Sequence, residues 1–186
     1  MTIESALAEA NDKMDKAVSV LKEELAGIRT GRATPALLSR VTVDYYGAPV
    51  PLQQLASMSV PEPRLLVVQP FDRNAIPAIE KAILASDLGI TPSNDGQLIR
   101  LAFPPLTEER RKELIKAVHH RGEEARVAVR NVRRHAKDEL ERLEREGAIS
   151  EDDLVRSEKE LQKLTDRHIA MVDEVVAHKE QELKEI

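Results

Sequence analysis

Five basic residues and no acidic residue lie in the run from Ala125 to Lys137, ARVAVRNVRRHAK. The basic residues are Arg126, Arg130, Arg133, Arg134 and Lys137. Arginine offers a planar pair of N–H donors that matches phosphate oxygens. At about 100° per residue on a helix, all except Arg134 fall on one stripe. The simplest alternative is a solvated helix face, but the positions four residues away, where balancing glutamates are expected, are mostly apolar or basic. We therefore favour a phosphate backbone as the partner.

The composition narrows the kind of polyanion. Aromatic residues make up only 2% of the chain, which argues against recognition of single strands by base stacking. Structured RNA, held by its backbone and shape, fits better. The chain is acidic overall, with a net charge of −5. A local basic face on an acidic protein predicts binding in one defined orientation, not general coating of nucleic acid.

A long helix from Thr107 to Glu146 must position these arginines. Thr107 is a good N-cap, and Gly147 follows the last periodic residue. Apolar or small residues recur at steps of three and four, which predicts one buried helix face. They are Leu114, Val118, Gly122, Ala125, Val129, Val132, Ala136, Leu140 and Leu143. The basic stripe lies roughly a quarter turn from this face.

Two further helices are predicted. The first begins at a Thr2 or Ser5 cap and ends near Ile28 or Arg29, and the last begins at Ser150. The apolar face of the last helix is predicted to contain Leu154, Leu161, Leu164, His168, Met171 and Val175. The first helix can bury its own apolar face only against the other two, which predicts a three-helix bundle.

The middle of the chain follows a different pattern. Val41, Val43 and Tyr45 alternate as in a strand, a turn is expected at residues 46–49, and residues 65–69 and 98–102 are apolar runs of strand length. Residues 74–86 read as a short amphipathic helix, and all ten prolines lie within residues 31–105. We predict an α+β protein: residues 1–30 and 106–186 form the bundle, and residues 31–105 an inserted β/α/β domain.

Two short connections join these parts. One is Thr30–Gly31–Arg32, and the other is Phe103–Pro104–Pro105–Leu106. Glycine in the first and proline in the second keep both out of helix. They predict a hinge, the alternative being a rigid junction between packed domains.

No catalytic or cofactor site is expected. The chain has no cysteine, His119 and His120 point about 100° apart on a helix, and His168 occupies a core position. Asp152 and Asp153 are most simply first-turn helix acids. GxxxxGK[ST] is absent, and no nucleophile, base and orienting group come together. We predict no enzyme activity, no cofactor and no metal. No apolar run approaches the roughly 20 residues of a membrane span, so we expect a soluble, intracellular protein.

Several longer stretches resemble the bacterial-type ribosome recycling factor family, nearly from end to end. They are IRTGRATPALL (28–38), VDYYGAPVPLQQLA (43–56), FDRNAIPAIEKAILASDLG (71–89), FPPLTEERRKEL (103–114), ARVAVRNVRRHAKDEL (125–140), ISEDD (149–153) and QKLTD (162–166). His135 departs from the family pattern, in which an acid is expected. This departure leaves the arginine stripe complete.

The resemblance implies an L-shaped, two-domain, monomeric cytoplasmic protein. It implies a factor that acts with elongation factor G and GTP hydrolysis to split the post-termination ribosome into subunits. Arg130 and Arg133 match positions that contact ribosomal RNA in the family, and Arg29 and Arg32 match the arginines of its RTGR motif. The inserted domain would be the lever on which the GTPase pushes. The rival interpretation is a coiled-coil adaptor without RNA binding, although three apolar helix faces in one chain satisfy each other.

Overall fold

The computed structural model describes residues 1–185. The chain divides into two compact units. The first contains Met1–Lys22 and Ile115–Gln181, and the second contains Glu23–Leu114 together with the C-terminal residues from Glu182. Each unit has its own apolar core. The long helices continue from one unit into the other.

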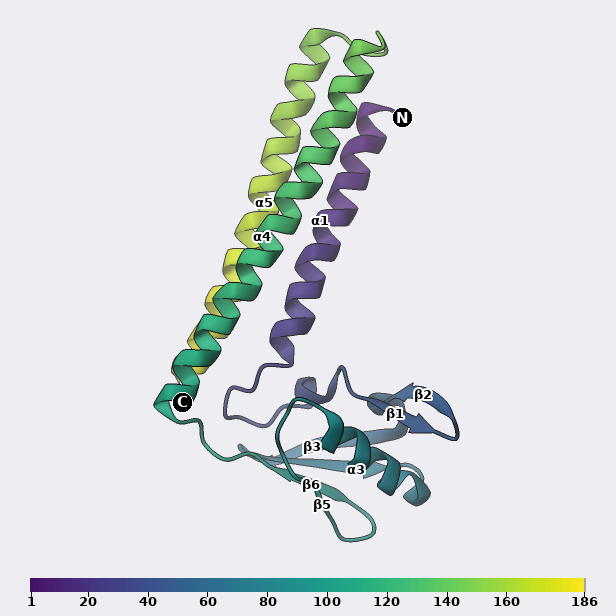
Figure 1. Cartoon of the computed structure of the whole chain (residues 1–186), viewed down its shortest axis with the longest axis vertical. Helices are drawn as coiled ribbons and strands as arrows, with labels where there is room; N and C mark the ends of the chain where they lie inside the picture. The colour runs from purple at the N-terminus through teal and green to yellow at the C-terminus, as the bar shows by residue number, and fades with distance from the viewer. Residues whose placement is uncertain (186) are drawn as a thin grey trace. The chain divides into compact units, whose positions relative to one another are not determined.

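Three long helices run side by side in the first unit (Figure 1). They are α1 (Ile3–Ala26), α4 (Glu108–Arg145) and α5 (Glu151–Lys184). With 38 residues, α4 is about 57 Å long. Met14 of α1, Val129 and Leu140 of α4, and Leu161 of α5 share one core and are almost fully buried. The predicted three-helix bundle is confirmed.

Capping residues set the helix starts that the sequence predicted. The Thr107 hydroxyl accepts a hydrogen bond from the Arg110 amide at 3.1 Å. Ser150 and Asp153 cap α5 reciprocally, with bonds of 3.0 and 3.3 Å between the amide of each and the side chain of the other. Bonds from the Ser150 backbone and side chain, and from Arg156, lower the pKa of Asp153. Gly147, at φ 76°, ends α4 in the left-handed conformation.

Two sequence predictions about the helices were wrong in detail. Helix α1 ends at Ala26, before the predicted end at Ile28 or Arg29. In α5, Met171 is 38% exposed while Val172 and Val176 are buried. Leu154, Leu161, His168 and Val175 of the predicted face recur every seven residues, whereas a straight helix has 3.6 residues per turn and drifts away from a heptad repeat. Over the length of α5 this drift moves the buried face by one residue.

The second unit is built on antiparallel strands. β1 (Thr42–Tyr45) and β2 (Ala48–Pro51) form a hairpin. β3 (Ala56–Glu62), β4 (Leu65–Pro70), β5 (Ser93–Asn94) and β6 (Ile99–Ala102) form a sheet in the order β3-β4-β6-β5. Its other helical segments are η1 (Pro35–Leu38), α2 (Leu52–Leu55), η2 (Arg73–Ala75) and α3 (Ile76–Ala85).

The core of this unit joins α3 to the sheet. Ile79 and Ile83 of α3 are fully buried in one cluster with Leu66 of β4 and Ile99 and Leu101 of β6. The sequence located β1, β4, β6 and α3 but placed a turn over Ala48 and Pro49, which belong to β2. That strand contains two prolines and no alternating burial, so it carries none of the usual strand signals. Within residues 1–185, none of the helices has the length and hydropathy needed to cross a membrane.

Candidate nucleic-acid interface

Helix α4 positions the predicted basic residues beside its buried face. Ala125, Val129 and Ala136 are buried, which fixes the rotation of the helix. The basic side chains therefore emerge to one side of this face, and their environments differ from one turn to the next.

Arg126 is neutralised within the bundle. Its guanidinium bonds Asp173 of α5 at 2.7 and 2.8 Å, and Glu123 at 3.2 Å. Only 20% of its side chain is exposed. Burial alone would lower the pKa of Arg126, but the hydrogen bonds that it donates to Asp173 and Glu123 outweigh burial and raise it. Gly122 permits this close approach, because a Cβ at that position would lie 2.6 Å from Cγ2 of Val176.

Arg130 and Lys137 have weaker partners. Nη1 of Arg130 lies 3.4 Å from Glu123, and Nζ of Lys137 lies 3.8 Å from Glu141. Acids therefore balance Arg126, and in part Arg130, contrary to the prediction from the sequence. The prediction considered positions four residues away, where Glu141 lies near Lys137, whereas the acids that pair with Arg126 and Arg130 lie three or seven residues away or on α5.

Arg133 and Arg134 remain uncompensated. The structure gives neither a hydrogen bond nor an ion pair within residues 1–185. Arg133 is half-buried and Arg134 is exposed. A half-buried guanidinium without a counter-ion is poised to bind an anion, because all of its N–H donors remain available to acceptors.

Backbone hydrogen bonds hold one end of each predicted connection to the turn at Pro63 and Arg64 of the second unit. The Ala33 amide, just after Arg32, donates to the Pro63 carbonyl at 2.7 Å, and the Phe103 amide donates to the Arg64 carbonyl at 2.8 Å. Thr30 and Phe103 are buried, and Gly31 is buried with φ 86°. The remaining members of the predicted hinge, Arg32, Pro104, Pro105 and Leu106, are exposed or half-buried.

Arg29 and Arg32 differ, although they share one motif. Arg32 is exposed. Arg29 is half-buried, donates a hydrogen bond to the Pro104 carbonyl, and lies with Cζ 5.9 Å from the centroid of the Phe103 ring. Burial lowers the pKa of Arg29, and the positive charge of Arg110 lowers it further.

The histidines have structural surroundings. His168 is 1% exposed, with Nδ1 2.8 Å from the Leu164 carbonyl oxygen and Nε2 2.7 Å from Asp15 Oδ1. The prediction that His168 is a packed core residue is confirmed. Nε2 of His119 lies 3.1 Å from Glu180. Among the residues that the structure describes, no three His, Asp or Glu side chains gather to hold a metal ion.

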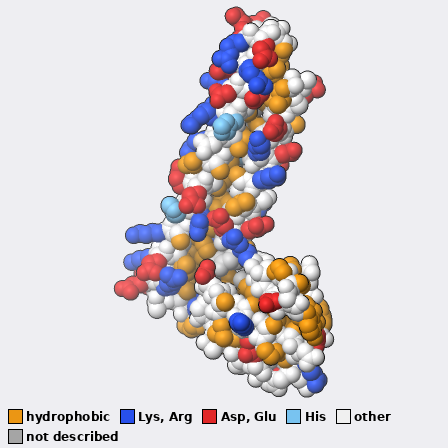
Figure 2. Space-filling view, turned by 45° about the vertical axis from the view of Figure 1, so that its right-hand side comes forward, with side chains coloured by type: hydrophobic (Ala, Val, Ile, Leu, Met, Phe, Trp, Pro, Cys, Tyr) orange, Lys and Arg blue, Asp and Glu red, His pale blue; other side chains and the backbone are white. Residues whose placement is uncertain are grey.

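An exposed apolar surface on the second unit (Figure 2) was not predicted from the sequence. Tyr46 and Phe71 are 79% and 73% exposed. Tyr45 packs edge-on against Tyr46, and its hydroxyl donates to Asp72 at 2.9 Å. This bond raises the pKa of Tyr45. The sequence did indicate a turn at Tyr46–Gly47. In the structure Tyr46 has φ 51° in this turn, a conformation that favours Gly or Asn.

A comparison with known protein families matches residues of both units. The sequence model of the family described as ribosome recycling factor matches residues 21–183. The chain belongs to this family. The resemblance seen in the sequence is confirmed.

Relatives and solved structures match over nearly the whole chain. A ribosome-recycling factor of Geobacillus kaustophilus is 60% identical over 97% of this chain and 97% of the relative. One of Acidothermus cellulolyticus is 55% identical over 99% of this chain and all of the relative. A solution structure of the ribosome recycling factor has a TM-score of 0.83 at 47% identity, covering 100% and 99% of the two chains. A second structure describes the T. thermophilus factor and E. coli elongation factor G bound to the E. coli post-termination complex. Its TM-score is 0.70 at 53% identity, covering 98% of this chain and 99% of that one.

Proposed function

We propose that this protein is a translation factor that recycles ribosomes after termination. Together with elongation factor G and GTP hydrolysis, it splits the post-termination complex into subunits. Family membership supports this function, as does the solved relative bound with elongation factor G to a post-termination complex. The structural observation that carries the RNA-binding part is the pair of uncompensated arginines, Arg133 and Arg134, on α4.

The basic residues of α4 would contribute unequally to RNA binding. Arg133 and Arg134 would bind ribosomal RNA phosphates directly, because no acid has to be displaced first. Arg130 and Lys137 would join them after releasing weak partners at 3.4 and 3.8 Å. Arg126 would contribute least, because two acids already hold its charge.

The protein itself performs no chemical step. The GTPase would supply the chemistry, and this chain would supply shape, charge and a hinge. We propose a bundle of residues 1–30 and 106–186 that binds RNA, and a domain of residues 31–105 that receives the push. Bending would occur at Thr30–Arg32 and Phe103–Leu106. The protein would act in the cytoplasm as a monomer that binds the large subunit.

Splitting of post-termination ribosomes, followed by light scattering, tests the function. We expect subunits to separate when this protein, elongation factor G and GTP are all present, and not when any one is omitted. Intact ribosomes with all three present would contradict the recycling function. If the protein failed to sediment with ribosomes at low salt, the adaptor interpretation would gain support.

A further inference from the structure

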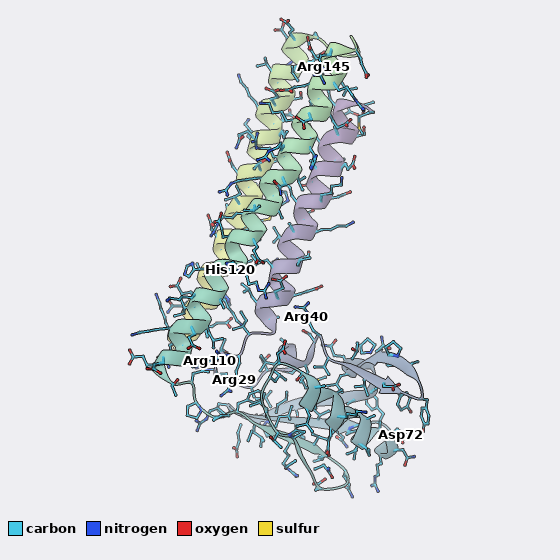
Figure 3. The ribbon with its side chains drawn as sticks, viewed as in Figure 1. Arg29, Arg40, Asp72, Arg110, His120 and Arg145 are labelled. Atoms are coloured by element: carbon cyan, nitrogen blue, oxygen red, sulfur yellow. The ribbon has the colours of Figure 1, made fainter. Side chains whose placement is uncertain are left out.

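Within the second unit, Arg29 links the two connections that were predicted to form a hinge. It lies directly before Thr30 of the first connection (Figure 3), and Nη2 of its side chain donates to the carbonyl of Pro104 in the second. Its guanidinium also lies over the Phe103 ring at 5.9 Å, within the range of a cation–π interaction. One side chain thus holds together segments that are 75 positions apart in sequence.

This contact leaves the charge of Arg29 unbalanced. Both partners are neutral, and across residues 1–185 the structure pairs no acidic side chain with this guanidinium. Its Nε is buried without a hydrogen-bond partner. The nearby cation, Arg110, is itself paired with Glu113 at 2.9 Å. A partly desolvated cation with neutral partners and an unused donor binds an anion more strongly than it binds a carbonyl oxygen.

We infer that Arg29 is an exchangeable latch. In the free protein it holds the two connections together through Pro104 and Phe103. On the ribosome, the Arg29 side chain leaves the Pro104 carbonyl for a backbone phosphate of RNA, whose oxygens can accept from Nε and Nη at once. The identity of this anion rests on the proposed function.

The exchange would loosen the joint when the protein binds RNA. Without Arg29, the connections remain fixed at their inner ends by the amides of Ala33 and Phe103. The segment Pro104–Pro105 would then lose the side-chain hydrogen bond that ties it to Arg29, directly before the first connection. Because binding and release would be coupled, weakening the latch should strengthen RNA binding through Arg29.

This coupling distinguishes a latch from a permanent structural contact. Phe103→Leu removes the ring beneath the guanidinium and leaves Arg29 in place. We expect it to tighten binding to purified large ribosomal subunits by about two- to fivefold, since less interaction must be broken. The gain should vanish in an Arg29→Lys background, because lysine lacks the planar fork. Equal or weaker binding by Phe103→Leu, or a gain that persists with Arg29→Lys, would overturn the exchange.

A measurement on the free protein decides whether the latch exists, even if Phe103→Leu folds poorly. The chain has no cysteine, so Ser19→Cys and Gln53→Cys give two unique spin-label sites at exposed positions. Arg29→Lys should broaden the distribution of distances between the labels. Arg32→Lys, the matched control in the same motif, should leave it unchanged. A distribution as narrow in Arg29→Lys as in the parent would refute the latch.

The two arms separate the latch from the function it serves. If the parent protein fails to bind large subunits, the proposed function fails, and the exchange loses its ligand. If the parent binds normally and Phe103→Leu gives no gain, only the exchange fails.

Discussion

Arg126 and Arg133 lie two helical turns apart on one side of α4, yet they have opposite surroundings. Arg126 bonds two acids, one of them on α5, and is largely covered. Arg133 is half-buried, and the structure gives it no acidic partner within residues 1–185. The first arginine joins two helices, and the second leaves its charge available. A basic stripe in sequence is therefore not one surface but two regions with different surroundings.

The largest expected effect concerns the paired region. Gly122→Leu would place a side chain where even a Cβ lies 2.6 Å from Val176 Cγ2. The helices must separate there, so the free energy of unfolding should fall by about 3 kcal/mol, at the upper end for overpacking. Urea denaturation measures this change. Val127→Leu, at a 45% exposed position of the same helix, is the control and should leave stability nearly unchanged.

The second effect compares the two arginines directly. Arg133→Ala should weaken binding to large ribosomal subunits by about 1.5–3 kcal/mol, the contribution of a charge-assisted hydrogen bond. Its stability should change by no more than about 0.5 kcal/mol. Arg126→Ala should do the reverse, losing up to about 1 kcal/mol of stability with its ion pairs and little affinity.

Sedimentation binding and thermal unfolding of both variants test this contrast. If Arg126→Ala weakened binding as much as Arg133→Ala, the distinction between the regions would be wrong. If Arg133→Ala lowered the melting temperature and left binding intact, Arg133 would be a structural residue.

The third effect is the salt dependence of binding. Four phosphates neutralised by Arg130, Arg133, Arg134 and Lys137 predict a log–log slope of about −3, from coefficients of 0.7–0.9 per phosphate. Arg134→Ala should make the slope shallower by about 0.7–0.9, and Arg126→Ala should not change it. Binding constants from 50 to 300 mM salt, a range of about sixfold, would give these slopes. A flat dependence for the parent would favour a protein-binding adaptor.

Much of this architecture could be predicted from the sequence because local signals determine it. Thr107, Gly147 and the Ser150–Asp153 pair fixed the ends of α4 and α5 through bonds between residues close in the chain. The neutralisation of Arg126 could not be predicted in the same way. Its main partner, Asp173, is 47 residues away and meets it only after the helices pack.

The same limit applied to the connections. Glycine and proline marked where the helices stop, but they did not reveal that Arg29 contacts Pro104. Tyr46 carried a readable local signal, a hairpin turn before Gly47, although its exposure depended on the folded domain. Local chemistry thus predicted elements and candidate residues, and tertiary packing decided which charges remained free.

The smallest expected effect comes from freeing Arg126, so that its surroundings become more like those of Arg133. Asp173→Asn removes the acid on α5 that bonds Arg126, while Glu123 remains at 3.2 Å. With half of its compensation gone, Arg126 should contribute to phosphate binding. Affinity for large subunits should rise by less than 1 kcal/mol, about the median value of an exposed ion pair.

The matched control is Asp166→Asn. Asp166 is an exposed acid of α5 that accepts a bond from Gln162, so this variant removes the same charge without releasing Arg126. Affinity measured for both at one low salt concentration separates release of Arg126 from a general change in charge. An equal gain in the two variants would show that net charge alone matters. A gain confined to Asp173→Asn, and abolished by adding Arg126→Ala, would show that the bundle keeps this arginine from RNA by pairing it.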